Sequence, residues 1–330
     1  MKLVQVLLVA GLLWAGTDPQ AAAEAEQGLA LAHSGKYELA IPHYRAALAL
    51  DPHFPGLDLN LGLAYFRLNR LPEAAAAFEG AIQADPASFQ VRVLLGMTYY
   101  GMGRFDAAAV HLKRAAGQQP DNLELRYKLA ECYLQTKRYE EATAEFRFLL
   151  TKEPDSARVH MLLGQVFDGA NRQEEAIAEF EAAVKAGPRE PEAHFGLGYL
   201  YWKQKRYEEA RREFQSELTS QPQHPQALAY LGDIEMQSGD NQQAAEHLEK
   251  ALLVDPRLRI AHLDLGIVLT AIHDADGAER HLREAIRLDP TRPDAHYRLA
   301  RLFQSLGREQ DAQAEFARVQ ELGRNRSPQP

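Results

Sequence analysis

The chain has 330 residues, of which 46% are hydrophobic and 25% are charged, and its formal net charge is −9. This negative charge argues against a nucleic-acid partner, because phosphate contacts require a basic surface. Cys132 is the only cysteine, which excludes an intramolecular disulfide. We expect Cys132 to be a small packing residue, since a reactive thiol would need basic neighbours that the sequence does not supply.

Residues 1–23 have the pattern of a secretory signal peptide. A lysine at the second position precedes a short apolar run from Leu3 to Trp14, and a polar segment leads to Ala21 and Ala23. The apolar run is shorter than the roughly 20 residues that a membrane-spanning helix needs. We therefore expect cleavage after Ala23, an exported protein that is periplasmic or secreted, and no integral membrane segment after cleavage. The alternative is an uncleaved hydrophobic cap on the first repeat.

Eight prolines recur at intervals of 34 residues, from Pro52 to Pro290 (86 − 52 = 34), with no insertion between them. A fixed period of this length is typical of a solenoid built from stacked repeats. We number each repeat so that its proline is position 32. The prediction is a signal peptide, then a solenoid over 24–326, then a disordered tail at 327–330. The repeats are 21–54, 55–88, 89–122, 123–156, 157–190, 191–224, 225–258, 259–292 and 293–326.

Each repeat is predicted to be a helix, a short turn and a second helix. In the second repeat, apolar residues recur at helical spacing from Leu57 to Leu68. Pro72 suits the first turn of the next helix, and Pro86 ends that helix. Nine repeats then give about eighteen antiparallel helices and no strands. Pro42 lies inside the second helix of the first repeat, which predicts a shortened or kinked start there.

Small and large residues recur at fixed positions of the repeat. Position 20 is alanine in all nine repeats, position 8 is glycine or alanine, and position 24 is always large and apolar, as in Gly62, Ala74 and Phe78. This pattern predicts that the two helices of a repeat cross closely, with the large side chain filling the space beside the small pair.

The second repeat matches the tetratricopeptide pattern at Leu61, Gly62, Tyr65, Ala74, Phe78, Ala81 and Pro86. The chain therefore resembles the tetratricopeptide repeat (TPR) family from Ala21 to Arg326. The departures are local, such as Glu217 in place of a small residue at position 27 of the sixth repeat. The resemblance implies an all-α, right-handed superhelical solenoid, whose first helices line a concave groove that holds peptides.

Histidines recur at positions 4 and 23, which raises the question of a metal site. Adjacent helices stand about 8–10 Å apart, whereas zinc ligands lie about 2.1 Å from one ion, so a ladder at this pitch coordinates poorly. We predict no metal, and we interpret the position 4 histidines, such as His160 and His194, as replacements for the aromatic residue of the family pattern.

No catalytic motif is recognisable in the sequence, so we predict neither an enzyme nor a cofactor. Acidic pairs such as Glu140 and Glu141 recur at the start of second helices, where carboxylates interact favourably with the helix dipole. The polar, proline-containing tail that begins at Gly323 is predicted to be disordered.

The predicted binding surface is a stripe on the first helices. Positions 2, 5, 9, 12 and 13 lie on the side of each first helix opposite its partner, and we call them the groove stripe. This stripe is unusually apolar and aromatic, which is typical of interaction surfaces. The alternative for any one residue is burial against a neighbouring first helix. The peptide-binding candidates are Leu63, Phe66, Met97, Tyr100, Tyr127, Met161, Phe195, Tyr199 and Trp202.

The function predicted from these features is a non-enzymatic scaffold that binds a peptide or helix of a partner protein, in cell-envelope assembly or secretion. The alternative is a substrate-recognition solenoid similar to that of protein O-linked N-acetylglucosamine transferases, acting with a separate catalytic chain. The asparagine ladder typical of those grooves is represented at position 6 only by Asn60. A third possibility is homo-oligomerisation through the terminal repeats.

Overall fold

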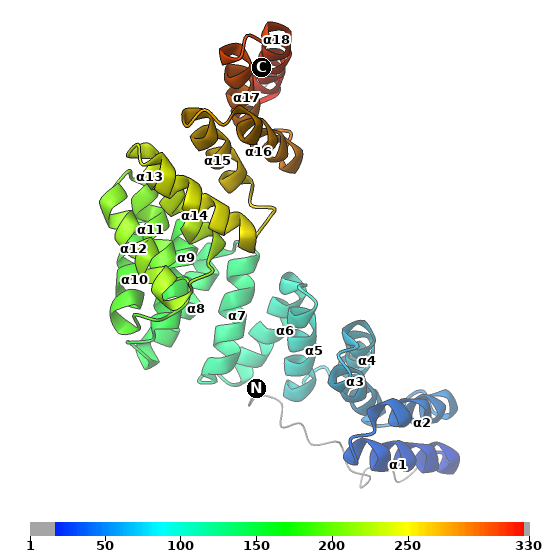
Figure 1. Ribbon diagram of the computed structural model, residues 1–330. Coiled ribbons are helices and arrows are strands. Elements are labelled where there is room, and N and C mark those ends of the chain that lie inside the picture. Colours follow the sequence, from blue (N-terminus) through cyan, green and yellow to red (C-terminus); the bar gives the residue numbers. More distant parts are fainter. Residues whose placement is uncertain (1–16, 327–330) are drawn as a thin grey trace. The chain divides into compact units, whose positions relative to one another are not determined.

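The computed structural model describes residues 17–326, and these residues form helices joined by short turns (Figure 1). This part of the chain holds 18 helices, arranged as nine antiparallel pairs, and no strand. The predicted all-α solenoid of TPR-like repeats is therefore confirmed. Most of the predicted signal peptide (1–16) and the predicted tail (327–330) lie outside the described residues.

The chain divides into two compact units, and the division falls within α9 (Ala157–Gly169). Unit 1 comprises Met1–Asp155 with Gln165–Arg172, and unit 2 comprises Ser156–Gly164 with Gln173–Pro330. Unit 1 contains α1 (Pro19–His33), α2 (Tyr37–Leu50), α3 (Leu57–Arg67), α4 (Leu71–Ala84), α5 (Phe89–Gly101), α6 (Phe105–Gln118), α7 (Leu123–Gln135) and α8 (Tyr139–Lys152).

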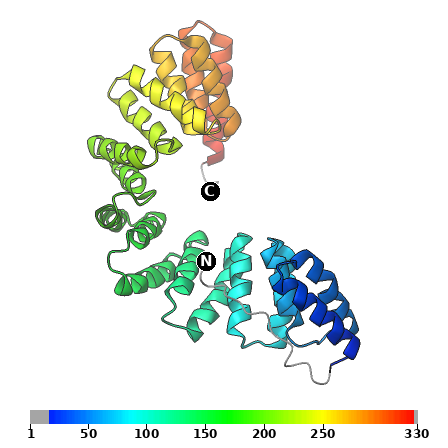
Figure 2. The ribbon, with the colours of Figure 1, turned by 60° about the horizontal axis from the view of Figure 1, so that its bottom comes forward.

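Unit 2 continues the same alternation of first and second helices. Each helix packs against the next one along the chain, and Figure 2 shows α13 to α18 stacked in this way, in yellow to red. Its helices are α10 (Gln173–Ala186), α11 (Ala193–Lys203), α12 (Tyr207–Ser220), α13 (Pro225–Gln237), α14 (Asn241–Val254), α15 (Arg259–Ala271), α16 (Ala275–Leu288), α17 (Pro293–Ser305) and α18 (Glu309–Arg326).

The two helices of a repeat meet where position 8 faces position 24. A Cβ added to Gly62 would lie 2.5 Å from Cδ1 and Cε1 of Phe78, so no larger residue fits without displacement. Gly28 faces Tyr44 and Gly266 faces Leu282 in the same way. The position 20 alanines are buried in all nine repeats. The predicted large-against-small packing is confirmed.

The predicted shortening of the second helix at Pro42 and the predicted disorder from Gly323 are wrong. Helix α2 begins at Tyr37 and has 14 residues, as α4 and α6 do, although Pro42 lies inside it. Proline removes only one backbone hydrogen bond, and the burial of Ala40 and Tyr44 holds this helix in place. At the other end, α18 continues from Gly323 to Arg326, because Leu322 is buried and anchors the last turn.

A polar pair between positions 4 and 23 joins the two helices of most repeats. Nδ1 of His160 lies 2.6 Å from Oε2 of Glu179, and His194 and His296 pair with the equivalent glutamates at the same distance. Arg126 donates to Glu145 at 2.6 Å. The interpretation of these histidines as replacements for an aromatic residue is therefore wrong. His160, His194 and His296 are the basic members of acid–base pairs, and the hydrogen bond that His194 donates to Glu213 raises the pKa of His194.

The acidic residues at the start of second helices take part in a second recurrent contact, with an arginine that stacks on an aromatic ring. The guanidinium at position 16 stacks on the aromatic ring at position 11, with Arg206 4.1 Å from the centroid of Tyr201. The same guanidinium donates to the carboxylate at position 19, as Arg138 does to Glu141 at 2.7 Å. The glutamates thus fix the arginine that covers the end of the first helix.

We predict that Gly62→Ala lowers the free energy of unfolding by about 1–3 kcal/mol, because the new methyl group overlaps the ring of Phe78. Gly117→Ala is the matched control, since Gly117 is also helical and no atom lies within 4 Å of its added Cβ. The control should stabilise the protein by about 0.5–1 kcal/mol. Chemical denaturation followed by circular dichroism measures both changes. Equal effects of the two substitutions would contradict the close-crossing argument.

Candidate functional site

The structure divides the nine groove-stripe candidates into buried and partly exposed residues. Leu63 and Met161 are only 4% and 7% exposed, and Leu59 and Val93 on the same stripe are also buried. The remaining seven candidates are partly exposed: Phe66, Met97, Tyr100, Tyr127, Phe195, Tyr199 and Trp202. These seven are available for contact with a partner, whereas the buried four support the helix packing beneath.

In unit 1 the groove stripe carries a mixed aromatic and ionic cluster. The hydroxyl of Tyr100 on α5 donates to Oε2 of Glu131 on α7 at 3.1 Å. Lys128 Nζ donates to the same oxygen at 2.7 Å and lies 4.6 Å from the ring centroid of Tyr100. Burial, and then the charge of Glu131, raises the pKa of Tyr100. The lysine therefore neutralises the acid of this cluster and covers part of the Tyr100 ring.

In unit 2 the stripe forms an aromatic cluster from Phe195, Tyr199 and Trp202 on α11 and Tyr230 on α13. Along α11 the ring centroids of Phe195 and Tyr199 are 6.4 Å apart, and those of Tyr199 and Trp202 are 6.1 Å apart. Tyr230 lies 4.8 Å from Trp202 and joins the cluster to Phe214 beneath it. The sequence pattern did not indicate Tyr230, because this residue stands at position 6, outside the groove stripe.

Acidic side chains form the polar border of this cluster, and the sequence reasoning missed them too. The indole N–H of Trp202 donates to Oδ2 of Asp233 at 2.5 Å. Asp264 on α15 is buried, and its Oδ2 has no hydrogen-bond partner within the described part of the chain. Burial, and then the charge of Asp233, raises the pKa of Asp264 well above its usual range. This end of the cluster is therefore acidic and only partly compensated.

The other end of the cluster is fixed by a buried carboxylate. Glu217 is fully buried and accepts the backbone N–H groups of Glu192 and Phe195, at 3.3 Å and 3.1 Å, at the start of α11. His224 stacks on the ring of Phe195 at 4.6 Å, and its Nε2 lies 3.2 Å from the carboxylate of Glu192. Glu217, which replaces the small residue of the family pattern at position 27, thus holds the start of α11, the helix that carries most of the aromatic cluster.

Three further findings bear on the chemistry of the chain. Cys132 is buried, and burial raises the pKa of its thiol to about 12. Among residues 17–326, no three histidine, cysteine or acidic side chains are grouped so that they could hold a metal ion. None of the helices in this range combines the length and apolar character needed to cross a membrane.

Helix pairs that recur every 34 residues, with a small residue at positions 8 and 20 and a proline at position 32 of the first eight repeats, define a TPR protein. Models of the tetratricopeptide repeat family match the chain at residues 25–89, 99–166, 162–227, 225–258 and 269–329. The chain belongs to this family.

Solved structures share the fold at low sequence identity. A tetratricopeptide repeat protein from Parabacteroides merdae ATCC 43184 is 18% identical and covers 76% of this chain and 100% of its own, with a TM-score of 0.54. Pseudomonas aeruginosa pilF is 20% identical over 60% of this chain and 90% of its own, with a TM-score of 0.49. YrrB, described as a TPR protein with an unusual peptide-binding site, is 18% identical over 55% of this chain and 93% of its own, with a TM-score of 0.47. The search of curated proteins gave no match.

We predict that Asp264→Asn raises the midpoint of thermal unfolding at pH 7 by about 2–4 °C. A carboxyl whose pKa is raised by folding destabilises the native state at any pH above its unfolded-state pKa, near 3.9. The gain should therefore shrink as the pH falls towards 4. Glu249→Gln, at an exposed position of the same unit, is the control and should change the midpoint little. A gain that does not depend on pH would argue against the buried charge as its cause.

Proposed function

We propose that the chain is a non-enzymatic protein-interaction scaffold, which holds an extended or helical segment of a partner protein against the groove stripe. The observation that carries this proposal is the aromatic cluster of unit 2, with Tyr199, Trp202 and Tyr230 partly exposed at its surface. Aromatic side chains are enriched at the energetically important centres of interfaces, because each buries a large area at a small cost in conformational entropy.

The rigidity of this cluster supports a binding role. Trp202 is held by its hydrogen bond to Asp233 and by stacking on Tyr199, and Phe195 is held by His224. Side chains that are already ordered lose little freedom when a partner binds, so more of the interaction energy appears as affinity. The family resemblance supports the same role, since TPR grooves hold peptides.

Export is the second part of the proposal, and its support is the N-terminal sequence pattern. We propose that the protein acts in the periplasm or outside the cell, in envelope assembly or secretion. Helix α1 begins at Pro19, and its N-cap Asp18 accepts N–H groups from Gln20 and Ala21. Cleavage after Ala23 would remove this cap and the first turn of α1.

The groove is tested by two surface variants in one capture experiment. Tyr199→Ser with Trp202→Ser removes the unit 2 cluster, and capture from an envelope extract should fall by about tenfold or more for a genuine partner. Leu253→Ser with Val110→Ser is the matched control, because these apolar residues are 83% and 51% exposed on second helices. Cross-linking followed by mass spectrometry should place the captured segment beside α11.

A partner that the folded groove variant and the control variant capture equally well would contradict the groove assignment. Circular dichroism checks that the groove variant keeps its helical content, so that a loss of capture is not a loss of fold.

Export is tested by expressing the full chain in a Gram-negative host and fractionating the cells. The protein should be found in the periplasm with Glu24 as its first residue, which intact-mass measurement and N-terminal sequencing can check. Leu8→Arg interrupts the apolar run near its middle and should leave uncleaved protein in the cytoplasm. An uncleaved wild-type chain in the cytoplasm would contradict this part of the proposal.

A further inference from the structure

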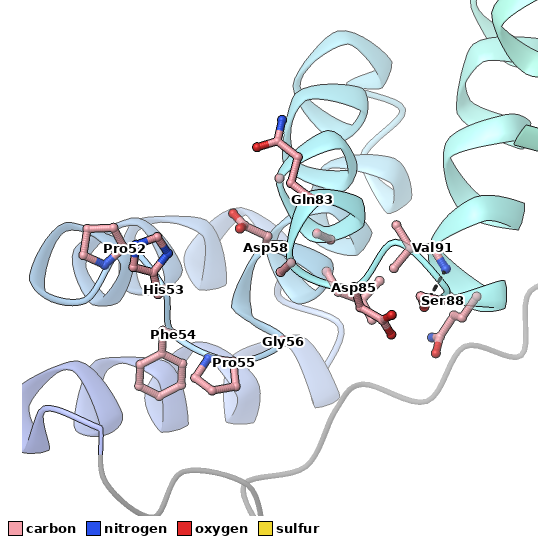
Figure 3. A pocket seen from close by; sticks show the side chains of 15 residues that line it. Pro52, His53, Phe54, Pro55, Gly56, Asp58, Gln83, Asp85, Ser88 and Val91 are labelled. Carbon is pink, nitrogen blue, oxygen red and sulfur yellow. Dashed lines mark hydrogen bonds between the residues drawn. The ribbon is translucent and has the colours of Figure 1, made fainter.

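A pocket of 590 Å³ lies in unit 1, and its lining includes Leu59 of the groove stripe but none of the aromatic stripe residues (Figure 3). The loop that carries Pro52, Phe54 and Pro55 forms one wall, and the end of α4 and the start of α5 form the other walls. The carboxylate of Asp58, in the first turn of α3, also lines it. The pocket therefore combines an apolar wall with an acidic group.

The carboxylate of Asp58 has no partner of its own. No residue of the described range makes a hydrogen bond or an ion pair with it, although it is only partly exposed. It lies against Gly80 on α4, where an added Cβ would come within 2.9 Å of Oδ2. Burial raises the pKa of Asp58, which is the expected response of a carboxylate that is desolvated without a compensating base.

Comparison with the other repeats shows what is missing. Asp58 occupies position 4, whose partner in most of the other repeats is the residue at position 23. In the first repeat the acid at position 4, Glu24, pairs with His43 at 2.7 Å. The second repeat keeps the acid but has Ala77 in place of the base. Every other repeat has histidine or glutamate at position 23: His43, His111, Glu145, Glu179, Glu213, His247, His281 and Glu315.

A second substitution leaves room beside the carboxylate. Gly80 lines the pocket and stands at position 26, where no other repeat has glycine. Ala77 is buried and does not line the pocket, so the missing base leaves Asp58 without a partner, and the glycine leaves its carboxylate uncovered on the side of α4.

We propose that this pocket binds a basic organic group, a guanidinium or ammonium carried on a short apolar stem, whose charge supplies Asp58 with the partner that the second repeat lacks. Asp58 accepts the charged hydrogen bonds, and Pro52 and Pro55 contact the stem. Asp85 is a second acid in the lining, which contains no lysine or arginine and one histidine, His53. The pocket therefore favours a cation over a neutral ligand, and this inference does not depend on the groove.

The chemistry is shared by an arginine side chain of a peptide and by a free amine, so the experiment has two arms. N-acetylarginine amide represents the peptide side chain and agmatine represents the free amine, and each is titrated into the full chain by NMR or calorimetry. Saturable binding of either probe supports the site. The probe that binds shows whether the ligand is an arginine side chain of a peptide or a free amine. N-acetylcitrulline amide, which is neutral and of similar shape, should bind about tenfold or more weakly.

Two variants make the assignment falsifiable. Asp58→Asn should lose about tenfold or more in affinity, and its fold should be retained because the carboxylate has no partner to lose. Asp58→Glu with Ala77→His recreates the Glu24–His43 pair of the first repeat, so it should keep the negative charge and still lose the ligand. Absence of saturable binding to both probes, or wild-type affinity in Asp58→Asn, would overturn the proposal.

Discussion

The approach of a small residue at position 8 to the large side chain at position 24 is the contact on which the rest of each repeat depends. Because the Cβ of a larger residue at Gly62 would lie 2.5 Å from the ring of Phe78, the distance between the two helices is set there. The neighbouring positions then fall at defined separations. Positions 4 and 23 come within hydrogen-bonding distance, and the groove stripe is turned away from the partner helix.

The same constraint explains why polar residues can vary at positions 4 and 23 without loss of the fold. The pair can be an acid with a histidine, a histidine with an acid or an arginine with an acid, as in Glu24–His43, His160–Glu179 and Arg126–Glu145. In each arrangement a basic side chain at one of the two positions pairs with an acidic side chain at the other. The second repeat departs from this rule through Ala77, which leaves Asp58 without a partner at the edge of the pocket.

The period and the small residues were sufficient to predict the helices, their pairing and the large-against-small packing. They were not sufficient to assign the histidines, because the pattern of one helix does not show which residue of the next helix lies opposite. The signal was nevertheless present: His160, His194 and His296 each have glutamate 19 residues later. The burial of Leu63 and Met161 could not be predicted from helical angles alone, since it depends on how closely neighbouring helices pack over the stripe.

Residues in contact between successive first helices are 31 positions apart in the sequence, a spacing that differs from the 34-residue period of the prolines. In unit 1 it places Tyr100 against Glu131, and in unit 2 it places Trp202 against Asp233 (131 − 100 = 31; 233 − 202 = 31). The chemistry at the two places differs. Lys128 neutralises Glu131, whereas Asp233 accepts only N–H groups of Trp202 and Gln237 within the described part of the chain. One repeat geometry therefore presents a neutralised ionic and aromatic cluster in unit 1 and an acid-bordered aromatic cluster in unit 2.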